Sequence, residues 1–242
     1  MNPISEVYNM DCMEYMKNIP DKFFDLAVVD APYGINAPNM NMGSFKGIES
    51  TAEKLRKGRL NKGAGKLKDI ALQTMPIAWD NGIPSKEYFD ELFRVSKNQI
   101  IWGGNYFPLP PSRCIVCWDK MQPWDNFSQI ELAWTSFDYP AKLFKYSTTG
   151  FRKGQKIIHP TQKPIPLYAY IFRQFANDGD KILDTHLGSG SSRIAAYKMG
   201  FDFYATEIDK EYFNAHEERF KLECFGEIKT SKGIITQTSL FE

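Results

Sequence analysis

The sequence has few of the residues and runs that mark several protein classes. Its 242 residues include four cysteines and three histidines. The cysteines are too few for a disulfide scaffold, and the histidines form no H-E-x-x-H motif or comparable cluster, so we expect reduced thiols and no metal. No apolar run reaches membrane-spanning length, and the N-terminus lacks the charged start and apolar core of a signal peptide. We therefore expect a cytoplasmic protein.

Net charge is also small, at +1, so composition gives no global signal for nucleic acid. Basic residues nevertheless gather inside residues 36–75, a stretch without hydrophobic periodicity. A loop of this length is either a solvated segment or a functional one. The functional interpretation is a basic flap that closes over a phosphate backbone. Its candidate DNA contacts are Lys54, Arg56, Lys57, Arg59 and Lys62.

Hydrophobic residues make up 43% of the chain, enough for one domain with a full core. Apolar residues at helical spacing predict four helices. One runs through Met13, Met16 and Ile19, one follows an N-cap at Ser85, one has Pro164 in its first turn, and one runs through Ile194, Ala195 and Met199. Short apolar runs bounded by turn residues predict strands at 7–9, 24–29, 99–102, 114–118, 130–134, 181–184 and 201–206. This alternation favours an α/β fold, a Rossmann-like and mostly parallel sheet with helices on both faces. We expect residues 1–242 to form a single domain with a C-terminal tail at 226–242.

The strand at 24–29 leads directly into Asp30-Ala31-Pro32-Tyr33, at the edge where open α/β sheets bind ligands. Asp30 and the Pro32 carbonyl could each accept an N–H bond from an exocyclic amine on a nucleobase. Two such acceptors would favour a tetrahedral nitrogen whose lone pair faces a methyl donor. Tyr33 offers a flat face to a base taken out of its stack, a contact worth roughly 1–3 kcal/mol. The tetrapeptide alone is equally consistent with an ordinary turn.

A second candidate site lies far downstream. A predicted strand ends at Asp184, the turn Gly188-Ser189-Gly190 opens a helix, and the following strand ends at Glu207. This order is typical of a mononucleotide-binding half, in which the acid holds ribose hydroxyls. Arg193 stands at the third glycine position of the dinucleotide fingerprint, which indicates a nucleoside without a pyrophosphate. S-adenosylmethionine fits, with Glu207 at the ribose and the glycine turn at the methionine end. The alternative is a tight turn without a ligand.

Together these motifs resemble a known family, the amino-group DNA methyltransferases. Asp30 to Tyr33 resembles their D-P-P-Y motif, and Asp184 to Gly190 resembles their D-P-F-x-G-S-G cofactor loop. His159 to Pro164 matches their H-P-T-x-K-P segment, and Asn9-Met10-Asp11 resembles the N-G-D stretch before the catalytic strand. With the catalytic motif first and the cofactor loop last, the order resembles the β class. That resemblance implies a circularly permuted methyltransferase order.

The resemblance implies a role for each matching residue. Asp30, Pro32 and Tyr33 would bind the target amine and its ring. Asp11 would lie near the adenine of the cofactor and Lys163 near its carboxylate. The full set implied to hold S-adenosylmethionine is Asp11, Thr161, Lys163, Asp184, Gly188, Gly190 and Glu207. In this family the stretch before the H-P-T-x-K-P segment reads the DNA sequence. Here that stretch is 138–158, with Lys145, Arg152 and Lys153 as candidate DNA contacts.

Two departures from the family pattern bear on substrate preference. Ala31 replaces the first proline of D-P-P-Y. Thr185 and His186 replace Pro-Phe before the glycines, which removes an aromatic residue beside the cofactor. Neither change removes a group that the chemistry needs.

The sequence thus predicts a site-specific DNA methyltransferase of the restriction-modification kind, in a bacterial or phage-infected cell. It would methylate N6 of an adenine flipped out of double-stranded DNA. Asp30 favours adenine because N4-cytosine enzymes of this family often carry Ser there. N4-cytosine methylation and an inactive DNA-binding relative remain the alternatives. The C-terminal end resembles a short peptide that docks on the sliding clamp, through Gln237, Leu240 and Phe241. The alternative is an ordinary tail that packs on its own domain. The oligomeric state, including a homodimer, is left open.

Overall fold

The structure is a computed structural model that describes residues 2–35, 80, 82–122, 128–147, 157–230 and 233–236. The chain divides into two compact units. Unit 1 comprises Met1–Asp30, Ser85–Ile101 and Lys163–Glu242. Unit 2 comprises Ala31–Pro84 and Trp102–Gln162.

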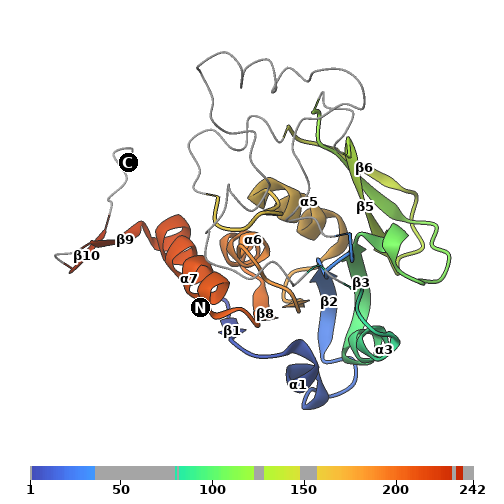
Figure 1. Cartoon of the computed structure of the whole chain (residues 1–242), viewed down its shortest axis with the longest axis horizontal. Coiled ribbons are helices and arrows are strands. Elements are labelled where there is room, and N and C mark those ends of the chain that lie inside the picture. The colour runs from blue at the N-terminus through green and yellow to red at the C-terminus, as the bar shows by residue number, and fades with distance from the viewer. Residues whose placement is uncertain are drawn as a thin grey trace. The chain divides into compact units, whose positions relative to one another are not determined.

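Unit 1 is built on parallel strands. Their order is β1 (Ser5–Tyr8), β8 (Asp202–Thr206), β7 (Lys181–Asp184), β2 (Phe24–Val29) and β3 (Ser96–Trp102) (Figure 1). Each neighbouring pair in this order is parallel. In the pairing of β2 with β7, Leu26 lies opposite Ile182 and Ala27 opposite Leu183. Because parallel strands end at the same edge, the residues after β2 and β7 share one edge.

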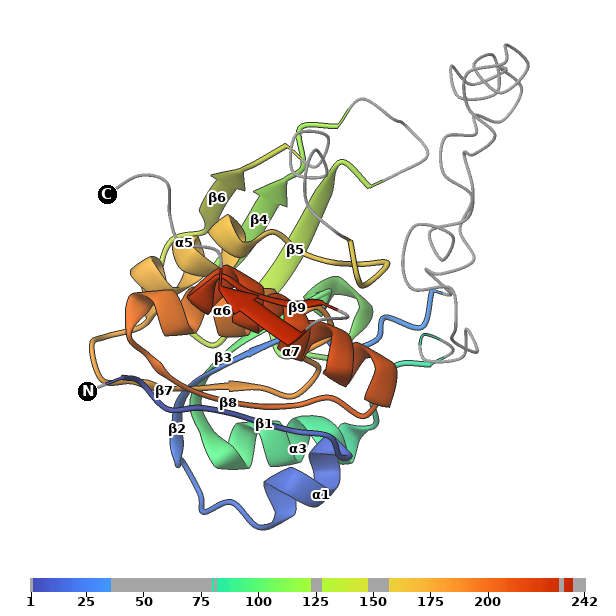
Figure 2. The ribbon, with the colours of Figure 1, turned by 90° about the vertical axis from the view of Figure 1, so that its left-hand side faces the viewer.

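Helices cover both faces of these strands. On one face α1 (Cys12–Lys17) packs against α3 (Lys86–Val95). On the other face α6 (Ser191–Met199) contacts both α5 (Ile165–Phe175) and α7 (Lys210–Phe225) (Figure 2). Leu167, Ile171 and Phe175 are buried on α5, as their i, i+4 spacing predicts. The predicted α/β fold, mostly parallel with helices on both faces, is confirmed.

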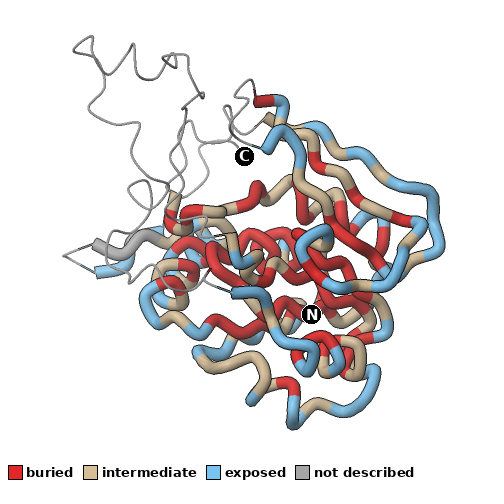
Figure 3. Tube along the Cα trace, turned by 45° about the vertical axis from the view of Figure 1, so that its right-hand side comes forward, coloured by how far each residue is buried: buried red, intermediate tan, exposed pale blue. Residues whose placement is uncertain are grey.

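The core of unit 1 follows its central strands, where the buried part of the chain trace is concentrated (Figure 3). Phe24, Leu26, Ile101, Ile182 and Phe203 are each 0–1% exposed. Strands covered by helices on both faces need such continuous apolar runs, because neither face of the sheet meets water.

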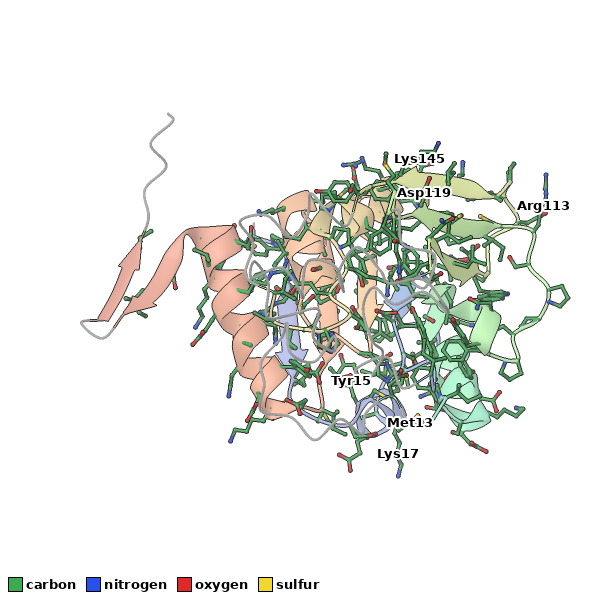
Figure 4. All side chains as sticks on the ribbon, turned by 45° about the horizontal axis from the view of Figure 1, so that its top comes forward. Met13, Tyr15, Lys17, Arg113, Asp119 and Lys145 are labelled. Atoms are coloured by element: carbon green, nitrogen blue, oxygen red, sulfur yellow. The ribbon has the colours of Figure 1, made fainter. Side chains whose placement is uncertain are left out.

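Unit 2 contains β4 (Ile115–Asp119), β5 (Ile130–Thr135), β6 (Lys142–Lys145) and the short 3-10 helix η3 (Gly104–Tyr106). β4 pairs antiparallel with β5 and parallel with β6. The register places Lys145 opposite Asp119, and these two residues lie close together, apart from Arg113, which precedes β4 (Figure 4). β6 falls within residues 138–158, where the sequence pattern indicates no strand.

Two elements of the C-terminal part differ from the sequence-based expectation. α7 begins at Lys210 and is capped by Asp209, whose carboxylate accepts N–H bonds from Glu211 and Tyr212. The buried face of α7 includes His216 and Arg219, so the helix lacks the apolar stripe that predicts one. After α7, β9 (Glu227–Thr230) and β10 (Gly233–Thr236) form an antiparallel hairpin inside the expected tail.

Several predictions fall outside the residues that the structure describes. They concern the flap at 36–75, the DNA contacts Arg152 and Lys153, and the C-terminal residues Gln237, Leu240 and Phe241. Within the described part, no helix combines the length and hydrophobicity needed to cross a bilayer. In the same residues no three His, Cys, Asp or Glu side chains gather as a metal site would require.

Candidate active site

Asp30 follows β2 directly, and its carboxylate forms an ion pair. Its Oδ2 lies 2.5 Å from Nζ of Lys163, with the two side chains 17% and 4% exposed. An ion pair this far from water holds its members firmly, because separating them would leave a charge in a poorly hydrated place. Lys163 therefore fixes the position of the Asp30 carboxylate. The role of Lys163 near the cofactor's carboxylate stays a prediction.

The turn between β7 and α6 needs both of its glycines. Gly188 and Gly190 have φ of 53° and 74°, a conformation in which a side chain is strained. A Cβ atom at Gly190 would also lie 3.2 Å from the Cβ of His216 on α7. The backbone of this turn therefore packs closely against His216 of α7, and its two glycine positions carry no side chain.

Glu207 stands at the end of β8 and is bonded to the same turn. Its Oε2 accepts the N–H of Gly188 at 2.7 Å, and its Oε1 accepts the N–H of Asp209 at 2.8 Å. The residue is 8% exposed, and burial raises its pKa. Each carboxylate oxygen has two lone pairs, so one N–H bond per oxygen leaves acceptor capacity for a ribose hydroxyl. This acid beside a glycine turn fits the nucleoside of S-adenosylmethionine.

The buried Asp184 side chain stabilises the turn through hydrogen bonds. Its Oδ2 accepts the hydroxyl of Ser192 at 2.6 Å, and its Oδ1 accepts the N–H of His186 at 3.1 Å. The residue is 1% exposed. Burial raises its pKa to about 7, and the charges of Asp30 and Glu207 add to the shift. All three acids stand at one edge of unit 1, because β7 pairs in parallel with both β2 and β8 and each acid lies at the end of its strand. The direct cofactor contact expected of Asp184 stays a prediction.

Asp11 lies close by in unit 1 and caps α1. Its Oδ1 accepts the N–H groups of Met13 at 2.8 Å and Glu14 at 3.3 Å. Asn9, two residues earlier, donates from Nδ2 to the backbone carbonyls of Glu207 and Ile208 at 2.7 and 3.1 Å. The stretch that resembles N-G-D is thus joined to the end of β8, as a shared cofactor site requires. Its contact with adenine remains a prediction.

In unit 2, Tyr33 belongs to an aromatic cluster that sequence reasoning missed in part. Its ring stacks on Tyr106 with centroids 5.1 Å apart and meets the edge of Phe107 at 6.1 Å. Gly103 has φ of 70°, and a Cβ atom there would lie 2.3 Å from the Tyr33 ring. The Tyr106 ring and the bare Gly103 backbone together fix the Tyr33 ring. No sequence signal singles out Tyr106.

Thr161 also lies in unit 2, within a turn. Its Oγ1 is 3.1 Å from Nδ1 of His159, and the N–H of Gln162 donates to the His159 carbonyl at 3.1 Å. The segment matching H-P-T-x-K-P therefore folds as a local turn before α5. The contact of Thr161 with the cofactor remains a prediction.

Sequence reasoning also missed the support that α7 gives to the glycine turn. Arg219 donates from Nη1 to the Ser189 carbonyl at 2.7 Å and to the Ser191 hydroxyl at 2.9 Å. Arg193, in the third glycine position, is 6% exposed, and its Nη1 lies 3.1 Å from Nε2 of His216. These bonds join residues 23 to 30 positions apart, a separation that no local pattern reveals.

The buried carboxyl of Asp184 leads to a prediction about pH. Its pKa is raised from 3.8 to about 7, so the folded chain holds this proton more tightly than the unfolded chain does. The stabilisation is complete below about pH 4 and is lost as pH rises through about 7. Asn resembles the protonated acid and does not titrate. The free energy of unfolding of Asp184→Asn, minus that of the unchanged protein, should therefore be larger at about pH 8 than at about pH 5. Urea unfolding at both pH values measures this difference. A difference that is constant or shrinks would contradict the assignment.

Comparison with known protein families identifies the family of the chain. A family model for N6 and N4 methylation, described as DNA methylase, matches residues 24–218, well over half of the chain. The match includes the Asp30 motif, the H-P-T-x-K-P segment and the glycine turn.

Similar curated proteins are type II methyltransferases at low identity. M2.MboI of Moraxella bovis is 23% identical over 247 residues, which covers 88% of this chain and 86% of that protein. M2.DpnII of Streptococcus pneumoniae is 27% identical over 147 residues, which covers 61% of this chain and 50% of that protein. The match therefore spans half the length of M2.DpnII and most of M2.MboI.

Solved structures share the fold. The M1.HpyAVI–SAM complex aligns with a TM-score of 0.53 at 18% identity, covering 88% of this chain and 98% of that one. The PvuII DNA methyltransferase, cytosine-N4-specific, aligns with a TM-score of 0.57 at 13% identity, covering 90% and 86%. S-adenosylmethionine as the cofactor is confirmed for the family. By sequence match and fold, this chain belongs to the family of S-adenosylmethionine-dependent N6/N4 amino-group DNA methylases.

Proposed function

We propose that this chain methylates the N6 amino group of an adenine flipped out of double-stranded DNA, and that it belongs to the β class. One observation carries the proposal. Asp30 and the glycine turn follow two neighbouring parallel strands, β2 and β7. The acid that would orient the amine and the backbone that would hold the methyl donor therefore share one edge of unit 1. The β-class assignment rests on the order in the chain, since Asp30 precedes the turn.

Asp30 acts in this mechanism by position. When bound, the cofactor supplies an electrophilic methyl group on a sulfonium. The Asp30 carboxylate accepts one N–H bond of the target amine, and the Pro32 carbonyl accepts the other, so the nitrogen lone pair faces the methyl group. Lys163, 2.5 Å from Oδ2 of Asp30, keeps the carboxylate in this orientation. Alignment of this kind can supply about 7–11 kcal/mol of the barrier.

Tyr33 holds the target base. The extruded base stacks on an aromatic ring, which compensates for the stacking lost in the duplex. The stacked contact of Tyr33 with Tyr106 keeps the Tyr33 ring in a defined plane. A base bound against a fixed ring presents its amino group in a reproducible direction, which in-line methyl transfer requires.

Glu207, Gly188 and Gly190 form the cofactor side of the proposed site. The Gly188 N–H bond fixes Glu207 for the ribose, and the two left-handed glycines let the backbone approach the methionine end. Asp11, Thr161 and Lys163 complete the proposed cofactor set. Lys145, exposed at the end of β6, is the described member of the proposed DNA-contacting set.

The choice of adenine rests on the acid at position 30, and N4 of cytosine is the second candidate. The structural likeness to the PvuII enzyme concerns the fold alone, so it does not favour cytosine. Mass spectrometry of nucleosides from DNA methylated by the purified protein separates the two products. N6-methyladenine supports the proposal, and N4-methylcytosine overturns the choice of base. If no methylated nucleoside is found on any DNA tested, the proposed function is overturned.

Removal of the acid should separate catalysis from cofactor binding. In Asp30→Ala, transfer of labelled methyl groups to DNA should fall to background while S-adenosylmethionine binds with unchanged affinity. Because this variant also removes the ion-pair partner of Lys163, Asp30→Asn serves as a second variant that keeps the side chain's size. Glu207→Ala, in contrast to Asp30→Ala, should weaken the affinity for S-adenosylmethionine about 10-fold or more. Calorimetry measures the affinities, and measurable turnover in both Asp30 variants would exclude Asp30 from the mechanism.

Displacing the Tyr33 ring should impair catalysis, because the target nucleobase would lose the ring on which it stacks. A methyl group at Gly103 would collide with the Tyr33 ring, so Gly103→Ala should lower methyl transfer at least about 10-fold. Gly179→Ala is the matched control, since Gly179 also has a positive φ, 86°, but no atom lies within 4 Å of an added Cβ. Both variants carry the strain of about 1–2 kcal/mol that a left-handed alanine costs. Equal activity in the two variants would show that the Tyr33 position is unimportant.

A further inference from the structure

A chain of polar contacts connects α3 with the start of the glycine turn. The hydroxyl of Tyr88 lies 2.7 Å from Oγ1 of Thr185, and that atom lies 3.0 Å from Nδ1 of His186. The Tyr88 ring also meets the edge of the His186 ring, with centroids 5.4 Å apart. Thr185 and His186 are the two residues that stand in place of Pro-Phe in the family motif. The mechanism above uses neither of them.

The direction of these hydrogen bonds follows from counting donors and acceptors. Tyr88 is 3% exposed, and among the described residues Thr185 is the hydrogen-bond partner of its hydroxyl. If Thr185 donated to Tyr88, the phenolic proton would have no acceptor, and a buried donor left unsatisfied is costly. If Tyr88 donates to Thr185, the Thr185 hydroxyl is free to donate to Nδ1 of His186. Only this direction satisfies all three groups.

The consequence is a defined form of the His186 ring. With Nδ1 as an acceptor, the ring proton must reside on Nε2. The surroundings agree with a neutral ring, because burial lowers the pKa of His186 to about 4. Thr185 is itself held, since its carbonyl accepts the hydroxyl of Thr206 at 2.9 Å. The Nε2–H group is therefore a hydrogen-bond donor whose orientation is set by α3 and β8.

His186 stands beside the groups assigned to the cofactor. Its own N–H donates to Asp184, and the nearby charge of Asp11 acts on its ring. One residue separates His186 from Gly188, and three separate it from Gly190. Thr185 is buried, whereas His186 is only partly buried. Within the described part of the chain, Nε2 of His186 has no hydrogen-bond partner. A donor held at this place suits an acceptor atom on a bound nucleoside or amino acid.

We propose that His186 contacts S-adenosylmethionine and donates a hydrogen bond to it from Nε2, with Tyr88 and Thr185 acting as positioning residues that fix the ring's tautomer. The inference rests on the proposed function, since it assigns a further residue to the same cofactor site. It also gives the departure from Pro-Phe a physical meaning. A polar contact to the cofactor replaces an apolar one.

The first test reads the tautomer directly, in the protein without cofactor. Nitrogen-15 NMR of the histidine rings distinguishes Nε2–H from Nδ1–H and from the doubly protonated ring. His186, assigned by comparison with His186→Phe, should be in the Nε2–H form at about pH 7. In Tyr88→Phe the Thr185 hydroxyl has no donor to accept from, so the preference for Nε2–H should weaken. A Nδ1–H or doubly protonated ring in the unchanged protein would overturn the proposal.

The second test measures the contact by calorimetry with S-adenosylhomocysteine, the demethylated cofactor. His186→Phe keeps a planar ring of similar size but has no donor, and we expect its affinity to fall about 10-fold. Tyr88→Phe should fall by a smaller factor, because the donor survives in part of the molecules. Tyr197→Phe on α6 is the matched control, since its ring contacts Phe220 and Phe225 far along the chain from the turn. It should bind as the unchanged protein does.

The outcomes separate this inference from the proposed function. Unchanged affinity in His186→Phe, together with normal DNA methylation by the unchanged protein, overturns the role of His186 alone. A failure of the unchanged protein to bind S-adenosylhomocysteine overturns both. Loss of affinity in His186→Phe with Asp30-dependent methylation intact supports both.

Discussion

The parallel pairing of β2 with β7 is the constraint on which the rest of the site depends. It brings residues more than 150 positions apart in the chain to one edge, with Leu26 opposite Ile182. Both strands are buried and apolar, so their register is set by the core and not by the site. The polar residues that follow each strand are then delivered to the same place without needing any attraction for one another. A site of this kind is as stable as the sheet beneath it.

That edge gathers three acids, and each is accommodated differently. Asp30 is paired with Lys163, Glu207 accepts two backbone N–H bonds, and Asp184 is buried with a raised pKa. Repulsion between buried carboxylates would otherwise oppose folding. The different roles of the three acids follow from these environments. The proposed ligand roles of Asp30 and Glu207 rest on these contacts, whereas the bonds of Asp184 to Ser192 and His186 hold the turn together.

The parts of this arrangement that local patterns encode could be predicted from sequence. The strands at Phe24 and Lys181, the helix carrying Leu167 and the stop at Gly200 follow from hydrophobic periodicity and turn residues. α7 could not be predicted in this way, because its buried face carries His216 and Arg219. Nor could the Lys163–Asp30 ion pair or the stacking of Tyr33 on Tyr106, since both depend on tertiary distances between residues far apart in the chain. The pairing of the Lys163 ammonium with Asp30 adds a contact that motif matching does not reveal, and the predicted role of Lys163 at the cofactor stays a prediction.

A structure of the protein bound to S-adenosylhomocysteine tests the central claim most directly. The account predicts that the cofactor's sulfur lies at the edge formed by β2 and β7, facing the Asp30 carboxylate, with its ribose on Glu207 and its backbone contacts at Gly188. A cofactor bound elsewhere on unit 1, or one whose sulfur faces away from Asp30, would contradict it.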